Sequence, residues 1–225
     1  MSSIARSPIP VGGLAATVVL LAVAGCATAG PGSSGGPAPS ATAAPAAPAQ
    51  PVATGADAQA QLAGLPMPSA TEPVMAIGLA LDDGDPILCL GPVMESAPPQ
   101  CSGPALAGFD WAQAEPVEMD GVRWAQVAMQ ATYDAEAQTV TQAGELLDLA
   151  AITMPAIEYP KGDLDEATIA AVQADLMTIR RPDVFGAAGL DGLVVLSVTY
   201  DDGSMQAAVD EIYGDGVVFV ESALR

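Results

Sequence analysis

Three carboxylates fall within one short turn, Asp82-Asp83-Gly84-Asp85. Because hard cations such as Ca²⁺ bind clustered carboxylate and carbonyl oxygens, Asp82, Asp83 and Asp85 are the candidate metal ligands of this chain. Their order departs from the EF-hand calcium loop, which needs alternate ligands and a closing Glu. Asp-Gly pairs are also common in turns. We therefore interpret the segment as a turn and predict no bound metal or other cofactor.

A second group of carboxylates, Glu115, Glu118 and Asp120, lies in the sequence near Trp111 and Trp124. Two carboxylates about 5 to 9 Å apart beside an aromatic platform could hydrolyse a sugar. A chain with 27 Asp and Glu residues offers such pairs in any case. It has no His, which excludes Ser-His-Asp and Cys-His catalysis and histidine-ligated zinc. We therefore expect no enzymatic activity and keep a carboxylate-based sugar-acting enzyme as an alternative.

The net charge of −21 restricts the partners of this chain. Nucleic acid is excluded because phosphate binding needs a basic surface. The same charge opposes adsorption to anionic lipid headgroups, so any membrane association must come from inserted lipid.

The first 26 residues have the order of an export signal. Arg6 precedes an apolar run from Ile9 to Gly25, as in a secretory signal peptide. The run ends in Val23-Ala24-Gly25-Cys26, which resembles the lipobox of bacterial lipoproteins. The resemblance implies removal of residues 1–25, acylation of Cys26 and attachment to the outer face of the cell membrane. An uncut transmembrane anchor and cleavage at another small residue are the alternatives.

The chain that follows Cys26 has a low-complexity composition. It is uncharged before Asp57 and consists mainly of Ala, Pro, Gly, Ser and Thr, a composition that cannot form a hydrophobic core. We predict a tether over residues 26–72. Its roughly 45 residues would give a root-mean-square reach of about 35 to 40 Å.

Two cysteines remain if Cys26 carries lipid. An even number of thiols in an exported chain predicts a disulfide between Cys89 and Cys101. Closing a loop of about 13 residues would stabilise the fold by on the order of 3 kcal/mol. A redox pair normally uses a Cys-x-x-Cys spacing, which these two residues do not have.

The body divides by its hydrophobic period into two segments. Residues 73–145 show short apolar runs at 74–81, 87–90, 122–133 and 139–141, which indicate strands. Trp124, Val127 and Met129 are the candidate core residues of the third run, and Phe109-Asp110-Trp111 is expected to cover the core. Residues 146–225 predict a helix capped at Asp163 and ending at Arg180-Arg181. A strand at 193–200, a helix at 204–213 and a strand at 217–220 follow. A strand, helix, strand run of this length is typical of a parallel crossover.

These elements predict an α+β fold. We expect a disulfide-bearing small β-sheet or OB-like barrel, followed by a helix-strand-helix-strand segment that either forms a second domain or belongs to the first.

Several short pieces of the body are similar to a group of uncharacterised exported proteins from actinobacteria. They are Cys89-x-Gly91, residues 98–104, Asp110-Trp111, residues 200–203, residues 213–218 and residues 221–224. The resemblance implies an exported protein and carries no known activity.

We therefore expect a membrane-anchored extracytoplasmic lipoprotein that serves as a non-enzymatic interaction or structural module of the cell envelope. Its expected partners are membrane lipid, through the acylated N-terminus, and an envelope protein or polymer that the sequence does not identify. A cation- or solute-binding lipoprotein is a further alternative.

Overall fold

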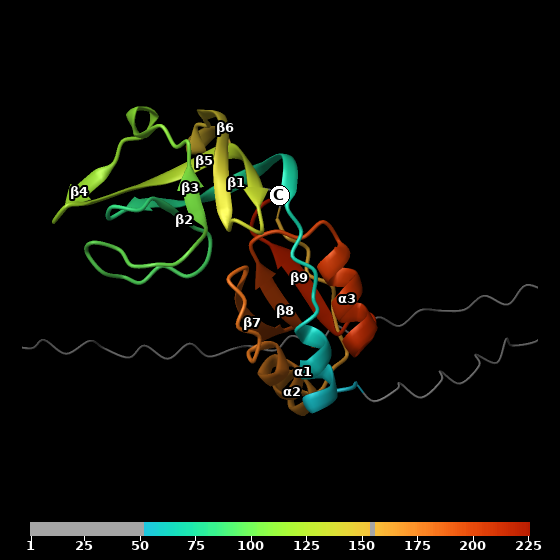
Figure 1. Cartoon of the computed structure of the whole chain (residues 1–225). Helices are drawn as coiled ribbons and strands as arrows, with labels where there is room; N and C mark the ends of the chain where they lie inside the picture. Colours follow the sequence, from blue (N-terminus) through green and yellow to red (C-terminus); the bar gives the residue numbers. More distant parts are fainter. Residues whose placement is uncertain (1–51, 154–155) are drawn as a thin grey trace, which may run out of the picture. The chain divides into compact units, whose positions relative to one another are not determined.

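The computed structural model describes residues 52–153 and 156–225 (Figure 1). The predicted signal peptide, the lipobox with Cys26 and the first part of the predicted tether lie outside the described residues. Pro48–Arg225 form a single unit, so the segments 73–145 and 146–225 belong to one folded body. None of the helices in the described part of the chain is long and apolar enough to cross a membrane.

Five strands of the first half close into a barrel. They are β1 (Ala70–Asp82), β2 (Ile87–Cys89), β3 (Ala105–Ala107), β5 (Val122–Asp134) and β6 (Thr139–Leu146). Their order is β1-β2-β3-β6-β5, and β5 also pairs with β1, which closes the barrel. Only β3 and β6 are parallel within it. The predicted α+β class with an OB-like barrel is therefore confirmed.

Alternate residues of β5 supply much of the barrel core. Every second residue of this strand is buried in one cluster: Ala125, Val127, Met129, Ala131 and Tyr133. β1 adds small side chains to the same cluster, among them Ala76 and Ala80. Small residues on β1 leave room for the larger residues of β5 inside a narrow barrel.

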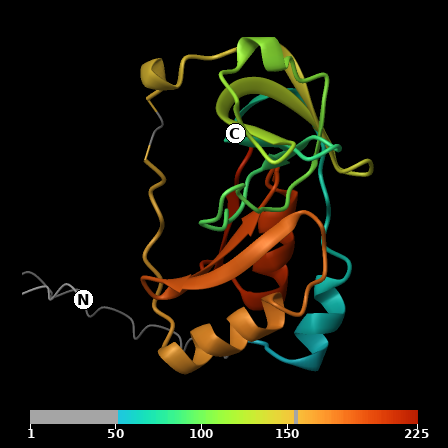
Figure 2. The ribbon, with the colours of Figure 1, turned by 90° about the vertical axis from the view of Figure 1, so that its left-hand side faces the viewer.

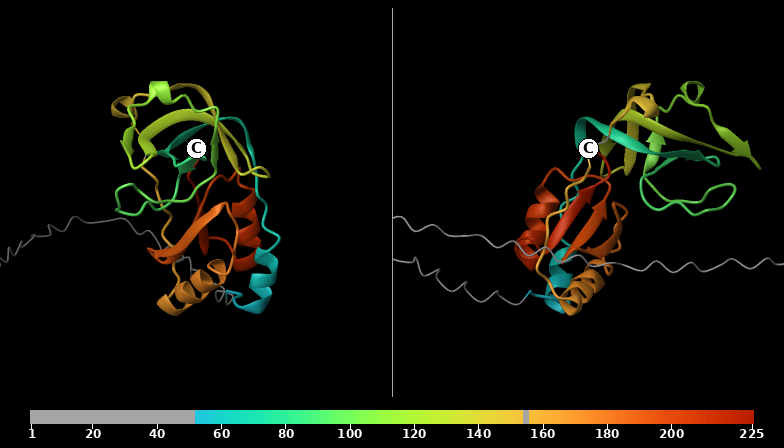
Figure 3. Two further views of the ribbon diagram at one scale, coloured as in Figure 1. Left: turned by 60° about the vertical axis from the view of Figure 1, so that its left-hand side comes forward. Right: turned by 180° about the vertical axis from the view of Figure 1, so that it is seen from behind.

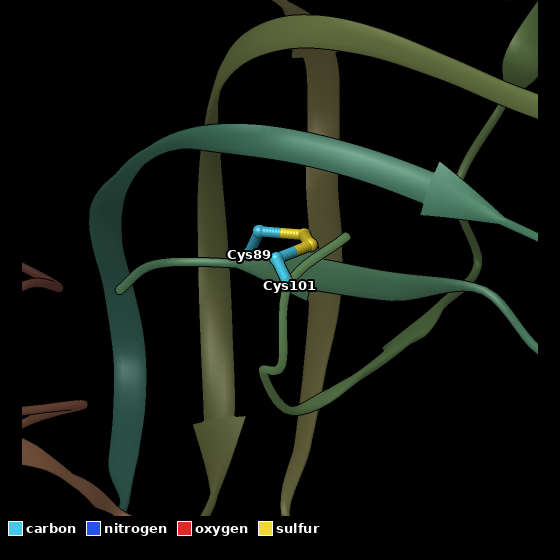
Figure 4. Close-up of a disulfide and its surroundings, with 2 residues drawn as sticks. All are labelled: Cys89 and Cys101. Atoms are coloured by element: carbon cyan, nitrogen blue, oxygen red, sulfur yellow. A yellow bond between two sulfur atoms is a disulfide. The ribbon is translucent and has the colours of Figure 1, made fainter. Parts of the chain in front are cut away.

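The opposite face of β1 and β5 carries a second apolar layer, and the predicted disulfide lies in it. Cys89 and Cys101 are bonded, with their Cα atoms 5.9 Å apart (Figure 4). They pack with Leu79, Leu81 and Trp124 outside the barrel. Trp124, expected in the core, therefore belongs to this outer layer, whereas Val127 and Met129 are core residues as predicted.

The second half forms a three-stranded sheet with helices. Its elements are α2 (Glu166–Leu176), β7 (Val184–Leu190), β8 (Leu193–Val198), α3 (Ser204–Tyr213) and β9 (Val218–Ser222). β8 and β9 are parallel and joined through α3, which is the predicted crossover. The apolar side chains of β8 and β9 pack with those of α2 and α3 in one core, with α3 beside β9 (Figure 3).

Two details of the predicted segment are wrong. β7 was not expected, so the order is helix, strand, strand, helix, strand. The predicted first helix also has other ends: Asp165 caps it, accepting a hydrogen bond from the Thr168 N–H at 2.8 Å, and it ends at Leu176, ahead of Arg180.

The structure also corrects the predicted tether. Residues 56–62, placed in it by composition, form helix α1 (Ala56–Leu62), which contacts α2 and α3 (Figure 2). Ala58, Leu62 and Leu65 are buried in the same core as β8 and β9. The folded body therefore includes α1 and the segment that leads from it into β1.

Buried polar groups hold α1 and the segment that follows it in place. The Asp175 carboxylate accepts hydrogen bonds from the Gly55 N–H at 2.7 Å and from Gln59 Nε2 at 2.8 Å. After the helix, the Arg181 guanidinium donates to the carbonyl oxygens of Leu65 and Pro66.

Arg181 itself is held by an ion pair. Its Nε and Nη2 donate to the two oxygens of Asp183 at 2.9 and 2.7 Å. The Asp183 side chain is only 1% exposed and that of Arg181 14%. The pair is therefore almost fully removed from water.

The C-terminus completes the barrel. Leu224 is fully buried in the barrel core. The Arg225 N–H donates to the Met75 carbonyl of β1 at 3.0 Å, and the Met75 N–H donates back to the Arg225 carbonyl. The last two residues of the chain are thus part of the barrel.

Side-chain amides occupy both edges of the three-stranded sheet. On β9, the Gln206 amide donates to the Val218 carbonyl and accepts from the Val220 N–H, both at 2.8 Å. On β7, Gln173 Nε2 donates to the Ala187 carbonyl at 3.1 Å. These contacts use backbone groups that an added strand would need.

Candidate functional site

The structure does not gather Asp82, Asp83 and Asp85 into a set of metal ligands. Asp82 Oδ2 accepts two hydrogen bonds from Arg123, from Nε at 2.9 Å and from Nη2 at 2.7 Å. Its Oδ1 accepts the Gly84 N–H at 2.9 Å, as in an Asx turn. Asp83 and Asp85 are exposed. The described residues contain no group of three or more acidic or cysteine side chains placed to hold a metal ion.

Arg123 connects this turn to an aromatic pair. Its guanidinium lies over the Trp111 ring, 4.4 Å from the ring centre, in cation–π contact. Trp111 meets Phe109 edge to face at 4.8 Å, and both rings pack against the barrel core, as predicted. The short 3-10 helix η1 (Trp111–Gln113) positions Trp111, with Asp110 accepting the Ala112 N–H at 3.0 Å.

An open hollow of about 600 Å³ lies where this turn meets the hairpin between β4 (Val117–Met119) and β5. Glu118 and Asp120, predicted for sugar chemistry, line it together with Asp82 and Asp83. Glu115 does not, and neither tryptophan does. Trp124 lies on the face of β5 opposite to the barrel core, in the outer layer. The structure therefore does not assemble the predicted carboxylates and tryptophans into a sugar platform.

The Asp82–Arg123 pair makes stability depend on pH. The Arg123 hydrogen bonds, followed by that of Gly84, hold the pKa of Asp82 below its ordinary value. The stabilisation is therefore full above the pKa of the unfolded chain, about 4, and is lost as the pH falls through the lower pKa of the folded chain. We expect Asp82→Asn to lower the free energy of unfolding by about 1 kcal/mol at pH 7 and by less in acid.

Denaturant unfolding of both proteins between pH 7 and pH 3 measures this difference. Asp83→Asn, which removes a carboxylate from the same turn, should stay within about 0.5 kcal/mol of the wild type throughout. A constant deficit of Asp82→Asn at every pH would show that the loss is steric.

The second hollow is an apolar groove of about 300 Å³ between the barrel and the C-terminal sheet. We call it the groove throughout. The barrel contributes the start of the loop after β2, and β7 contributes four residues. β8 contributes its last two residues, and the end of β9 and the residue after it contribute one each. The lining residues are Leu90, Gly91, Pro92, Phe185, Gly186, Ala187, Ala188, Ser197, Val198, Glu221 and Ala223.

Glycine positions shape the groove. A methyl group on Gly91 would lie 3.1 Å from the Phe185 ring, so the absence of a side chain at 91 lets the ring close one end. A methyl group on Gly186 would meet nothing within 4 Å, because that position faces the open space of the groove.

The polar side of the groove is held in place from outside. Glu221 accepts a hydrogen bond from the Tyr159 hydroxyl at 3.1 Å and pairs with Arg225 at 3.4 Å. The Tyr159 ring packs edge to face on Phe219, 5.6 Å away. Burial and the Glu221 carboxylate raise the pKa of Tyr159, which keeps its hydroxyl protonated and able to donate. Tyr159 thus packs on β9 beside the groove.

Sequence reasoning did not find the groove. Its lining comes from four separate stretches of the barrel and sheet, and one of them, β7, was not predicted. The available signal was the unexplained Gly-Ala-Ala-Gly run at 186–189, whose small side chains leave the space.

No protein-family model, curated protein or solved structure matches this chain. Its function is therefore not given by similarity to a known protein. Attachment through Cys26 and the resemblance to exported actinobacterial proteins stay predictions.

Proposed function

We propose that the chain is an extracytoplasmic lipoprotein, held to the membrane through acylated Cys26, whose folded body is a non-enzymatic binding module. The groove is the observation that carries the binding role. The lipobox Val23-Ala24-Gly25-Cys26 and the preceding apolar run support the location.

The composition of the groove is that of a binding site. Small-molecule and anchor sites are concave, mostly apolar, and carry few polar groups. Here the walls are Phe185, Leu90 and Pro92, and the polar groups are the Ser197 hydroxyl and the Glu221 carboxylate. The lining holds no lysine or cysteine to activate Ser197, and Glu221 is already engaged by Tyr159 and Arg225. This arrangement favours binding over catalysis.

The location is tested by Cys26→Ala. We expect the wild type to incorporate labelled palmitate and to sediment with membranes, and the variant to lose both properties, because no acyl chains can be attached. The double variant Cys89→Ala/Cys101→Ala, which keeps Cys26, should still be labelled. Membrane retention of Cys26→Ala as firm as that of the wild type would mean that an uncut apolar segment is the anchor.

The binding role is tested by a photo-reactive amino acid placed at Ala188 in the groove. We expect a discrete cross-linked species in intact cells from this position. Ala207 is the matched control because it is exposed on α3, outside the groove. Equal cross-linking from both positions, or none from Ala188, would contradict a binding role for the groove.

A further inference from the structure

The charge of the folded body restricts what the groove can receive. All 27 acidic residues lie at or after position 57, against five basic residues in the same region. Three of these five, Arg123, Arg181 and Arg225, already form ion pairs within the body. Such a surface attracts basic partners over long range and repels acidic ones.

The apolar surface continues beyond the groove. Val93 and Met94 directly follow the lining residue Pro92, and their side chains are 41% and 66% exposed. They lie in the loop that the Cys89–Cys101 disulfide closes. Exposed apolar side chains next to an apolar groove are typical of a surface that binds a protein.

The sheet edges argue against recognition by strand addition. The Ala187 carbonyl of β7 is bonded to Gln173, and two backbone groups of β9 are bonded to Gln206. A peptide strand at these positions would have to displace the glutamines. Insertion of a partner's side chain into the groove is therefore favoured over strand addition.

Resting on the proposed binding function, we infer that the partner is a basic protein segment that places an apolar side chain in the groove beside Phe185 and Gly186. The volume of about 300 Å³ is at the lower end of the range for ligand sites, which suits one anchor side chain. Lys and Arg flanking the anchor would face the acidic body.

Labelled peptides test separately whether binding needs the apolar anchor and whether it needs the basic flanking residues. The probe is Lys-Lys-Leu-Phe-Lys-Lys, with Lys-Lys-Ser-Ser-Lys-Lys and Glu-Glu-Leu-Phe-Glu-Glu as controls for the anchor and for the charge. The protein is the full chain in phosphatidylcholine nanodiscs, with empty nanodiscs as background. We expect saturable fluorescence anisotropy for the first peptide and binding at least tenfold weaker for the other two.

Gly186→Leu shows whether the groove is the site. The new side chain would point into open space, and Gly186 does not need a glycine backbone conformation, so the fold should tolerate it. We expect at least a tenfold loss of probe affinity. Ala207→Leu, on α3, should bind as the wild type does.

Equal binding of the Leu-Phe and Ser-Ser peptides, equal binding of the Glu peptide, or unchanged affinity in Gly186→Leu would overturn the inference. Specific cross-linking from Ala188 together with any of these results would leave the proposed binding function in place and reject only the basic partner. No cross-linking from Ala188 would reject the function itself.

Discussion

Arg181→Ala should lower the free energy of unfolding by about 3 to 5 kcal/mol, the usual cost of removing one partner of a buried ion pair. The substitution leaves the Asp183 carboxylate, 1% exposed, without its counter-ion. It also removes the donors to the carbonyl oxygens of Leu65 and Pro66, which join α1 to β1. Urea unfolding followed by circular dichroism measures the change.

Arg180→Ala is the matched control, because Arg180 is the exposed neighbour of Arg181. It should change stability by less than about 0.5 kcal/mol. A similarly small loss in Arg181→Ala would mean that water replaces the guanidinium and that the pair is not effectively buried. Arg181→Lys should recover only part of the loss, because an ammonium group cannot reproduce the two-pronged contact.

Leu62→Ala should destabilise the body by about 2 to 5 kcal/mol, as large-to-small changes in a core do. Leu62 is 1% exposed and packs in the core shared by α1, α2, α3 and the C-terminal sheet. The result distinguishes a docked helix from a flexible tether, because in a tether the same substitution would not change the free energy of unfolding. Thermal and denaturant unfolding provide the measurement.

Gln61→Ala is the control within the same helix. Its side chain is exposed and bonds only to the Asp57 carbonyl of α1, so the effect should be below about 0.5 kcal/mol. If Leu62→Ala were as silent as Gln61→Ala, α1 would not contribute to the stability of the body.

The sequence predicted those parts of the fold that depend on local pattern. The apolar run at 122–133 predicted core residues at Val127 and Met129, and the even number of cysteines left after Cys26 predicted the pairing of Cys89 and Cys101. The apolar run at 193–200, the helix at 204–213 and the apolar run at 217–220 predicted the parallel crossover. Each of these strands and helices was predicted from a short stretch with its own hydrophobic period.

Two elements were missed because tertiary contacts form them. α1 consists of seven residues, too few for a stable isolated helix, and its alanine-rich composition resembles that of the preceding low-complexity segment. Asp175 and Arg181, more than 110 positions away in sequence, bind the residue before the helix and the segment after it. β7 has glycine and alanine where a strand pattern would need larger residues, and pairing with β8 defines it.

The candidate site was the least predictable part. Three carboxylates in one turn indicate a cation site by residue type alone. Arg123 neutralises Asp82, however, and that contact joins residues 41 positions apart in the sequence. The groove has no motif of its own, because it exists where β7, β8, β9 and the loop after β2 leave space between small side chains.

The barrel core joins residues that lie far apart in the sequence. Leu224 supplies part of that core, and Arg225 exchanges backbone hydrogen bonds with Met75 in the middle of β1. The N-terminal strands therefore cannot complete their core before residues 224 and 225 have been synthesised, although domains usually fold in the order in which they emerge from the ribosome. A truncation that removed Leu224 would weaken the barrel rather than the neighbouring C-terminal sheet, although that residue follows the last strand of the sheet.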